Sequence, residues 1–398
     1  MELVDLFCGC GGLSLGAHNA GFETALAVDS DSNLRSAYRR NFVGRSVAGF
    51  DLQKVAGEAL RARLRTRKLT GVIGGPPCQG FSVMGRSQKD DPRNTLVSKF
   101  LEIAISLEPA FFVMENVPGF LSDRHSALRE AALSQIPQKY KIVGPVKLNA
   151  ADYGAATNRE RVVLIGYDPD YLDELSLSDL ENAKLDRPRV TVGEALSGLV
   201  ASKANTATDV GFDWVRLDRR CERSDYATSL HPSAPCRYLS KTARRLYSEG
   251  YVTGFQPTEH APQTIKRFSE TEPGKQETVS RYYRLAWDRT APTLRAGTGS
   301  DRGSYQAARP IHPEEPRVIT VREAARLQGF PDWFMFHPTK WHSHRMIGNS
   351  VSPIFAEAIM RVIASKLDMN ENPHGKTYKV GRSADARASL ALDVAGAK

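Results

Sequence analysis

The sequence lacks the features that would place the chain in a membrane or outside the cell. No apolar run approaches the length of about 20 residues that is needed to span a bilayer. The N-terminus, Met1 to Asp5, carries acids where a secretion signal has basic residues, and no cleavage site follows it. We therefore expect a cytoplasmic protein with no membrane partner.

Cysteine is scarce and scattered. The five cysteines are Cys8, Cys10, Cys78, Cys221 and Cys236. An odd, dispersed set does not indicate a disulfide framework. Neither the Cys8 and Cys10 pair nor the His342 and His344 pair has a second pair at zinc-finger spacing. We predict no metal site.

The length and the charge indicate more than one domain and a polyanionic partner. With 398 residues, the chain is too long for one average domain. It carries 54 Lys and Arg against 45 Asp and Glu, which suits a nucleic acid. Residues 211–310 hold 17 Lys and Arg against 11 Asp and Glu, so most of the excess lies in this irregular segment.

The first 165 residues or so alternate strand-like and helix-like segments, which predicts an α/β fold with a mostly parallel sheet. The strands expected are Leu3–Phe7, Phe22–Val28, Gly71–Gly74, Ala110–Met114 and Arg161–Tyr167. The helices expected follow the glycine cluster Gly9–Gly16 and span Asn94–Ser106, Thr320–Gln328 and Pro353–Leu367. Ligands bind at the carboxyl ends of the strands in such sheets, so three unusual sequences at these ends are the candidate site.

A glycine-rich turn follows the first strand, and Asp29 ends the next one. Glycine lets the backbone approach a ligand closely, and an acid at that position can accept hydrogen bonds from a ribose. The pattern fits an adenosine-type cofactor, although a tight turn without a ligand gives the same pattern.

Cys78 and Glu115 follow two buried strands. Pro76 and Pro77 stiffen the backbone before Cys78, and Gly80 permits a bend after it, which favours an exposed nucleophile over a buried, inert thiol. For the other cysteines the buried interpretation is preferred. Glu115 is a candidate proton donor, with a helix cap or a surface salt bridge as the alternative.

Five motifs stand in an order that resembles the DNA (cytosine-5) methyltransferases. They are Asp5–Leu13, Gly75–Ser82, Glu115–Val117, Asn158–Val162 and Gly348–Val351, and Arg326–Pro331 is similar to the family's last motif before the Gly-Asn-Ser turn. The resemblance covers most of residues 1–167 and about 285–365.

The resemblance implies methyl transfer from S-adenosylmethionine to carbon 5 of a cytosine flipped out of a specific double-stranded DNA sequence. Cys78 would add covalently to the ring, Glu115 would hold ring nitrogen 3 and the amino group, Arg161 would bind the exocyclic oxygen, and Arg159 would support the pocket. The residues implied to bind the cofactor are Phe7, Gly9, Gly11, Gly12, Asp29, Asp51, Pro76, Leu96, Asn349 and Val351.

The resemblance also implies a division of the chain. We expect a Rossmann-like catalytic and cofactor-binding domain at 1–186, a target-recognition domain at 187–318, C-terminal helices completing the catalytic domain at 319–368 and a disordered tail at 369–398. The candidates for DNA contact are Ser82, Arg219, Arg220, Arg237, Arg244, Arg245, Arg281 and Arg295, although for any single arginine a solvated surface charge is favoured over a specific base contact. We expect a monomer associated with the nucleoid, with a cognate restriction endonuclease as a further partner.

Two departures and two alternatives remain. Thr157 stands where the family often has Gln, and Ser30 where it often has an aromatic side chain against adenine. A transfer-RNA methyltransferase on the same scaffold is one alternative, disfavoured because the Cys-Phe-Thr tripeptide of such enzymes is absent. A non-catalytic DNA-binding regulator is the other, disfavoured because Cys78, Glu115 and the glycines are present.

Overall fold

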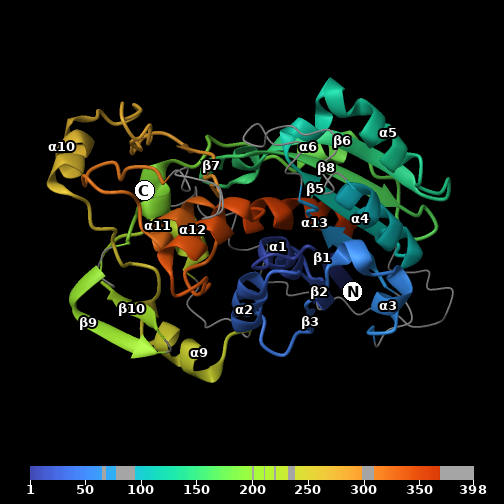
Figure 1. The fold of residues 1–398 in the computed structure, drawn as a ribbon, viewed down its shortest axis with the longest axis horizontal. Helices are drawn as coiled ribbons and strands as arrows, with labels where there is room; N and C mark the ends of the chain where they lie inside the picture. The colour runs from blue at the N-terminus through green and yellow to red at the C-terminus, as the bar shows by residue number, and fades with distance from the viewer. Residues whose placement is uncertain are drawn as a thin grey trace, which may run out of the picture.

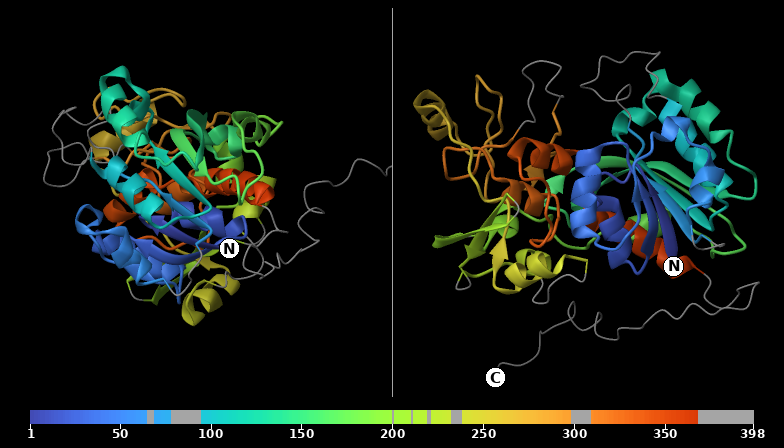
Figure 2. Two further views of the ribbon diagram at one scale, coloured as in Figure 1. Left: turned by 90° about the vertical axis from the view of Figure 1, so that its right-hand side faces the viewer. Right: turned by 60° about the horizontal axis from the view of Figure 1, so that its bottom comes forward.

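The computed structural model describes residues 1–64, 69–77, 95–199, 201–209, 211–218, 221–231, 238–297 and 309–367. An α/β part is built on a large sheet, and a smaller part with short helices and long loops lies beside it (Figure 1). The C-terminal helices run across the middle of the molecule between these two parts (Figures 1 and 2).

Seven strands form the large sheet, in the order β3-β2-β1-β4-β5-β8-β6. Their bounds are β1 Glu2–Leu6, β2 Glu23–Val28, β3 Val47–Ala48, β4 Gly71–Gly74, β5 Phe111–Asn116, β6 Lys141–Asn149 and β8 Glu160–Tyr167. The first five strands pair in parallel, whereas β8 is antiparallel to both β5 and β6. The predicted α/β fold with a mostly parallel sheet is therefore confirmed.

Helices cover both faces of this sheet because its strands are apolar on both sides. In β5, Phe111 and Val113 belong to the core that α1 and α13 complete, while Phe112 and Met114 pack with α4 and α5. The helices of this part are α1 Gly12–Asn19, α2 Ser32–Asn41, α3 Gly57–Arg61, α4 Thr95–Ser106, α5 Ser126–Leu133, α6 Leu177–Asn182 and α13 Pro353–Lys366. Gly16 allows α1 to lie directly on α13, since a Cβ there would come within 2.4 Å of Ala356.

The smaller part contains an antiparallel sheet in the order β11-β10-β9. Its elements are β9 Ala201–Asp209, β10 Phe212–Leu217, α8 Asp225–Leu230, α9 Lys241–Ser248, β11 Tyr251–Val252 and α10 Pro262–Glu270. Trp214 of β10 is buried in a core that also contains residues of α9 and α11. The segment predicted to be irregular therefore has its own short elements and shares a core with the C-terminal helices.

Two joints connect the parts. Strand β12 (Ala291–Pro292) pairs in parallel with β7 (Thr157–Asn158), which directly precedes β8. The remaining helices are α7 Val192–Leu196, α11 Val321–Leu327 and α12 Lys340–Asn349. The second joint lies at α11. There Arg326 makes a bidentate ion pair with Asp332, at 2.8 and 2.7 Å, and donates to the Ser197 carbonyl at 2.7 Å. Both side chains of the ion pair are fully buried.

The predicted strands and helices are confirmed, with ends that differ by a few residues. Among the elements that the sequence interpretation missed are β6, α2, α5 and α12. The predicted N-cap Asn94 and the tail at 369–398 lie outside the described residues. Within the described ranges, no helix has the length and apolar character needed to cross a membrane.

Candidate active site

An acidic and a basic side chain meet where β5 and β8 lie side by side. Glu115 of β5 pairs in register with Val163 of β8, and Arg161 lies two residues earlier on the same face. The Nε of Arg161 is 2.7 Å from Oε1 of Glu115, and the two side chains are 11% and 13% exposed. Burial lowers the pKa of Arg161, while the attraction of Glu115 opposes that shift. The ion pair therefore fixes the carboxylate at the carboxyl end of β5.

The loop after β4 lies against this ion pair. A Cβ on Gly75 would sit 3.0 Å from Oε2 of Glu115, so glycine lets the loop approach the carboxylate. Nδ2 of Asn116 donates to the Pro76 carbonyl at 3.5 Å, and its Oδ1 accepts from the Val117 amide at 2.8 Å. The predicted nucleophile Cys78 and the predicted phosphate contact Ser82 lie outside the described residues, which end here at Pro77.

Arg159 is fully buried and joins three segments. Its guanidinium donates to the Leu294 carbonyl at 3.1 Å and to the Gly348 carbonyl at 2.8 Å, and its backbone amide donates to Oδ1 of Asn149 at 3.0 Å. Burial holds the pKa of Arg159 well below its ordinary value. Arg159 therefore ties the junction of β7 and β8 to the loop after β12 and to the end of α12.

The glycine-rich turn between β1 and α1 adopts a backbone that favours glycine. Phe7, Gly9 and Gly11 have φ of 60°, 57° and 103°. The Gly9 amide donates to Oδ2 of Asp29 at 3.0 Å, so the turn and the acid predicted to bind one ligand are in contact. Burial raises the pKa of Asp29, against the hydrogen bonds from Asp31 and Gly9. A Cβ on Gly9 would meet no atom within 4 Å, so its Cα faces open space.

The other predicted cofactor residues lie on neighbouring elements. Gly12 starts α1 where a Cβ would come within 2.4 Å of the Val351 carbonyl, which brings the Gly348–Val351 motif onto the turn. Pro76, Leu96 and Val351 are buried, and Asn349 is exposed. Asp51 is the N-cap of a short 3-10 helix, where it accepts from the Gln53 amide at 3.1 Å.

Comparison with known proteins decides the family. A family model described as C-5 cytosine-specific DNA methylase matches residues 1–365.

The chain belongs to this family.

The same conclusion follows from individual relatives. The type II methyltransferase M.XorII of Xanthomonas oryzae pv. oryzae is 39% identical over 364 residues, which cover 89% of this chain and 82% of that protein. M1.HphI of Haemophilus parahaemolyticus is 31% identical, with 94% and 88% covered. A solved DNA modification methyltransferase encoded within a prophage of E. coli is 36% identical, with a TM-score of 0.78 and coverage of 92% and 99%. The structure of S. pombe Dnmt2, at 15% identity and a TM-score of 0.57, shares the fold alone.

This cytosine-5 DNA methyltransferase is thus of the kind found in type II restriction–modification systems, and its family uses S-adenosylmethionine. The glycine turn fits such a cofactor, because Gly9 borders open space and the Asp29 carboxylate lies beside it. Ser30 stands where the family often has an aromatic residue, and it has no ring that could pack against adenine. Its carbonyl accepts from Arg35 at 2.6 Å, and the same guanidinium donates to the Asp29 carbonyl at 2.9 Å. Arg35 therefore fixes the segment that carries the acid.

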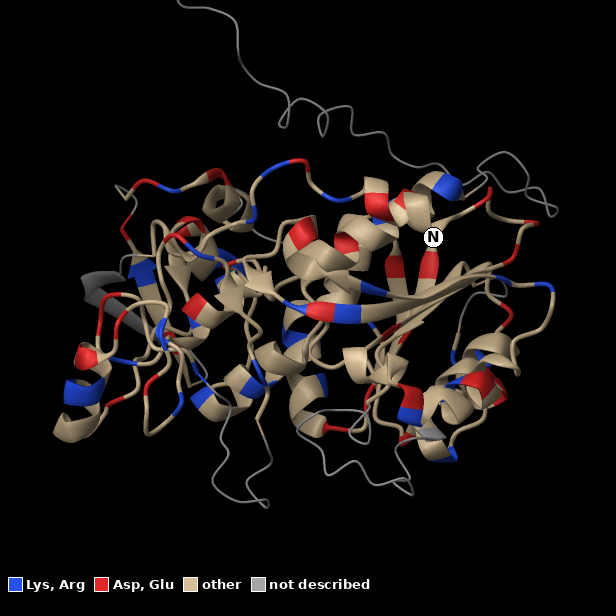
Figure 3. Ribbon diagram, turned by 90° about the horizontal axis from the view of Figure 1, so that it is seen from above, with Lys and Arg blue, Asp and Glu red and all other residues tan. Residues whose placement is uncertain are grey.

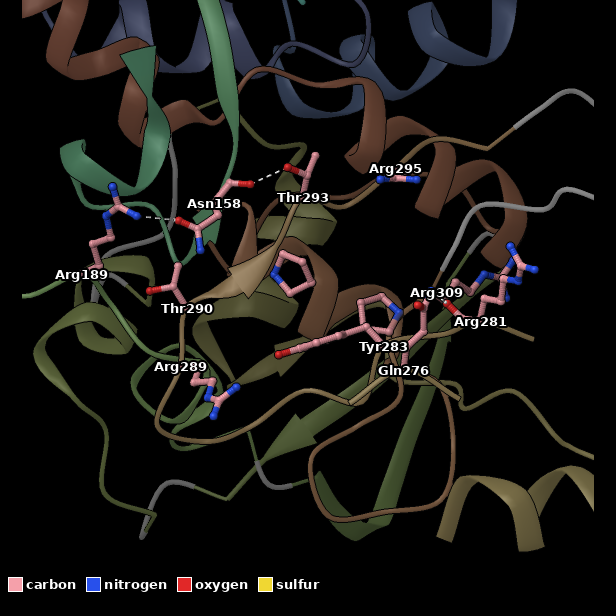
Figure 4. A pocket seen from close by; sticks show the side chains of 12 residues that line it. Asn158, Arg189, Gln276, Arg281, Tyr283, Arg289, Thr290, Thr293, Arg295 and Arg309 are labelled. Atoms are coloured by element: carbon pink, nitrogen blue, oxygen red, sulfur yellow. Dashed lines mark hydrogen bonds between the residues drawn. The ribbon is translucent and has the colours of Figure 1, made fainter. Parts of the chain in front are cut away.

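A groove of about 750 Å³ lies between the two parts of the methyltransferase (Figure 4). It is lined by Asn158, Arg189, Gln276, Arg281, Tyr283, Arg289, Thr290, Pro292, Thr293, Arg295, Arg309 and Pro310. Among the described residues of this lining, five are arginines and none is acidic. Charged residues of both signs are spread over the rest of the molecule (Figure 3), so the single sign of this lining marks the groove as a place for an anionic ligand.

The groove includes some of the predicted DNA contacts and adds others. Of the predicted DNA contacts, Arg281 and Arg295 line it. Arg244 and Arg245 lie on α9, which contributes no lining residue, and Arg219, Arg220 and Arg237 lie outside the described residues. The sequence interpretation missed Arg189, Arg289 and Arg309.

Arg189 illustrates why these residues were missed. It contacts Asp152 at 2.6 Å and donates to Oδ1 of Asn158 at 2.8 Å, and so reaches the groove from a segment before the basic region. Arg289 and Arg309 flank Arg295 within the basic region. The concentration of basic residues in this region was the available signal for a DNA contact. Nothing in the sequence separates these two arginines from arginines that are only solvated.

Proposed function

We propose that this chain methylates carbon 5 of a cytosine flipped out of a specific double-stranded DNA sequence, with Cys78 as the nucleophile. The observation that carries the proposal is the nearly buried ion pair of Glu115 and Arg161 beside the loop that leads to Cys78. A carboxylate and a guanidinium held side by side match the donor and acceptor edge of a cytosine.

Each residue has one role in the proposed reaction. The Cys78 sulfur bonds to carbon 6 of the ring, which makes carbon 5 nucleophilic, while Glu115 shares a proton with ring nitrogen 3 and Arg161 donates to the exocyclic oxygen. Bound S-adenosylmethionine supplies the methyl group as an electrophile. Loss of the proton from methylated carbon 5 then restores the double bond and releases Cys78. Arg159 acts as a positioning residue, because its guanidinium is occupied by two backbone carbonyls.

The cofactor would lie over the glycine turn. Asp29 would bind the ribose, Asp51 would contact adenine, and the remaining walls would come from a set on four neighbouring segments. That set is Phe7, Gly9, Gly11, Gly12, Pro76, Leu96, Asn349 and Val351. Support comes from the contact of the Gly9 amide with Asp29 and from the close approach of Val351 to Gly12.

DNA would lie along the arginine-lined groove, with the target base turned toward Glu115. Phosphate contacts from arginines fix the register of a protein on DNA, whereas contacts with base edges select the sequence. We further propose that the methyltransferase acts as a monomer on nucleoid DNA and protects the site of a cognate endonuclease, as the naming of relatives as type II methyltransferases favours.

The test uses tritiated cofactor with the full chain, unmethylated duplex DNA and transfer RNA. The proposal expects label in DNA alone, retained at carbon 5 of cytosine. Label in transfer RNA alone would favour the RNA alternative, and label in neither would favour a DNA-binding regulator. Bisulfite sequencing of DNA from cells that express the chain then gives the sequence around each methylated cytosine.

A further inference from the structure

A short hairpin projects one arginine into the groove. Gln276 and Tyr283 form an antiparallel bridge, and the Glu277 amide donates to the Tyr282 carbonyl at 2.8 Å. The Gln276 side-chain amide closes the turn by donating to the Arg281 carbonyl at 2.7 Å. Figure 4 shows Gln276, Arg281 and Tyr283 together on one side of the groove. Three residues of this small ribbon therefore line the surface proposed for DNA.

The tip of the hairpin is held from inside by Glu277. Its side chain is 2% exposed, and its carboxylate accepts from the Val279 amide at 3.0 Å and from the amide and hydroxyl of Ser280. Arg267 of α10 approaches the same carboxylate at 3.3 Å. Burial opposes ionisation, yet these partners outweigh it and lower the pKa of Glu277. These contacts hold the backbone of the tip in one conformation without any ligand.

Two of the exposed side chains at this tip bear on what it could recognise. Val279 is 67% exposed, although it is apolar, and Arg281 is exposed beside it. Arg281 has φ of 58°, a left-handed conformation that is costly for a residue with a Cβ. Such conformations persist where the surroundings enforce them, and they gather at functional sites. Here the conformation sets the direction in which the Arg281 side chain leaves the backbone of the ribbon.

A phosphate contact would not need this construction, because a flexible side chain can follow a phosphate at little cost. Recognition of a base edge needs a planar donor held in a fixed direction. The major groove of DNA admits a two-stranded ribbon, and the bidentate contact of arginine with O6 and N7 of guanine is the commonest specific contact there. The major groove of DNA also presents the thymine methyl group, and an exposed apolar side chain such as Val279 suits a contact with it.

We infer that the hairpin Gln276–Tyr283 reads the recognition sequence from the major groove, and that Arg281 selects a guanine in it. This inference rests on the proposed function, since it needs DNA in the groove. It assigns the guanine contact to one of the five arginines and leaves phosphate positioning to the others.

The experiment compares bisulfite sequencing profiles of cells that express the full-length wild type, Arg281→Gly, Arg281→Lys or Lys266→Ala. Glycine keeps the left-handed backbone while it removes the guanidinium, and lysine keeps the charge while it removes the bidentate donor. Lys266 is an exposed cation on α10 that does not line the groove, so Lys266→Ala controls for loss of one positive charge.

The inference expects both Arg281 variants to relax the preference at one guanine position by about 10- to 100-fold, with the other positions and the Lys266→Ala profile unchanged. A recognition sequence that stays unchanged while methylation falls equally at all sites would overturn it and make Arg281 a phosphate contact. Absence of methylation by the wild type would instead contradict the proposed function, so the two failures are distinguishable. Thermal unfolding of each purified variant shows whether it is folded.

Discussion

At the scale of single residues, Glu115 and Arg161 form the part of the site on which the proposed chemistry depends most. An ion pair this little exposed interacts strongly, because water screens it poorly. The 2.7 Å contact uses Oε1 of Glu115, while Oε2 faces the loop at Gly75. A base placed there would meet a carboxylate whose position is already fixed, which is what general acid–base catalysis requires.

Glu115→Gln should abolish most of the activity without unfolding the protein. The amide keeps the shape of the side chain but cannot exchange a proton with a cytosine ring, so we expect the single-turnover rate of methylation to fall by about 10²- to 10⁴-fold. Titration calorimetry should show unchanged affinity for S-adenosylmethionine. Glu102→Gln, at an exposed position of α4, is the matched control. A rate for Glu115→Gln within about threefold of the control would remove Glu115 from the proposed chemistry.

At the scale of elements, the turn between β1 and α1 is supported by a buried polar cluster. The Ser14 hydroxyl donates to Oδ2 of Asp5 at 2.5 Å and lies 3.0 Å from the Tyr38 hydroxyl, and Thr24 links this group to His18. Burial raises the pKa of Asp5 to about 7, although the hydrogen bond from Ser14 opposes the shift. The protonated carboxyl is therefore the form that the folded turn favours.

Because of this cluster, we expect the free energy of unfolding to fall as the pH rises. Because the pKa of Asp5 is higher in the folded than in the unfolded chain, its contribution is complete at low pH and is lost as the pH rises through about 7. From about pH 5 to about pH 8, the wild type should lose about 2 to 3 kcal/mol more free energy of unfolding than Asp5→Asn, whose amide does not titrate. Urea unfolding at both pH values measures this. Parallel pH profiles for the two proteins would show that Asp5 does not titrate as proposed.

The elements also show what could be predicted from the sequence. Residues 111–114 of β5 are all apolar because helices cover both faces of the strand, so this strand was evident from the sequence. Strand β6 lies at a sheet edge with exposed residues among buried ones and carried no clear pattern. Helix α12 was missed because it contains two polar positions, Ser343 and His344, that only tertiary contacts bury. The groove was missed because it depends on the pairing of β12 with β7, which are distant in sequence.

At the scale of the whole molecule, the two parts are held in place by buried charge as well as by apolar packing. Arg326 and Asp332 are both inaccessible, and His231 adds a contact of 2.8 Å to the same carboxylate. Burial disfavours the charged carboxyl, but Arg326 outweighs it and holds the pKa of Asp332 well below its ordinary value. Arg326 also donates to the Ser197 carbonyl, so this pair joins α11 to the segment that follows α7.

Asp332→Asn should therefore destabilise the whole chain. It leaves the Arg326 guanidinium buried without its counter-ion, which costs on the order of 3 kcal/mol of free energy of unfolding. Urea denaturation followed by circular dichroism measures the change, with Asp173→Asn at an exposed position as the control. Equal midpoints for the two variants would mean that the pair contributes nothing to stability.

The most direct test of the central claim is covalent trapping on duplex DNA that carries 5-fluorocytosine at the methylated position. Fluorine cannot leave carbon 5 as a proton does, so a thiol bonded to carbon 6 stays attached. In the presence of S-adenosylmethionine, we expect a protein–DNA adduct that survives denaturing electrophoresis for the wild type, and no adduct for Cys78→Ser. An adduct that persists in Cys78→Ser would contradict the assignment of Cys78 as the nucleophile.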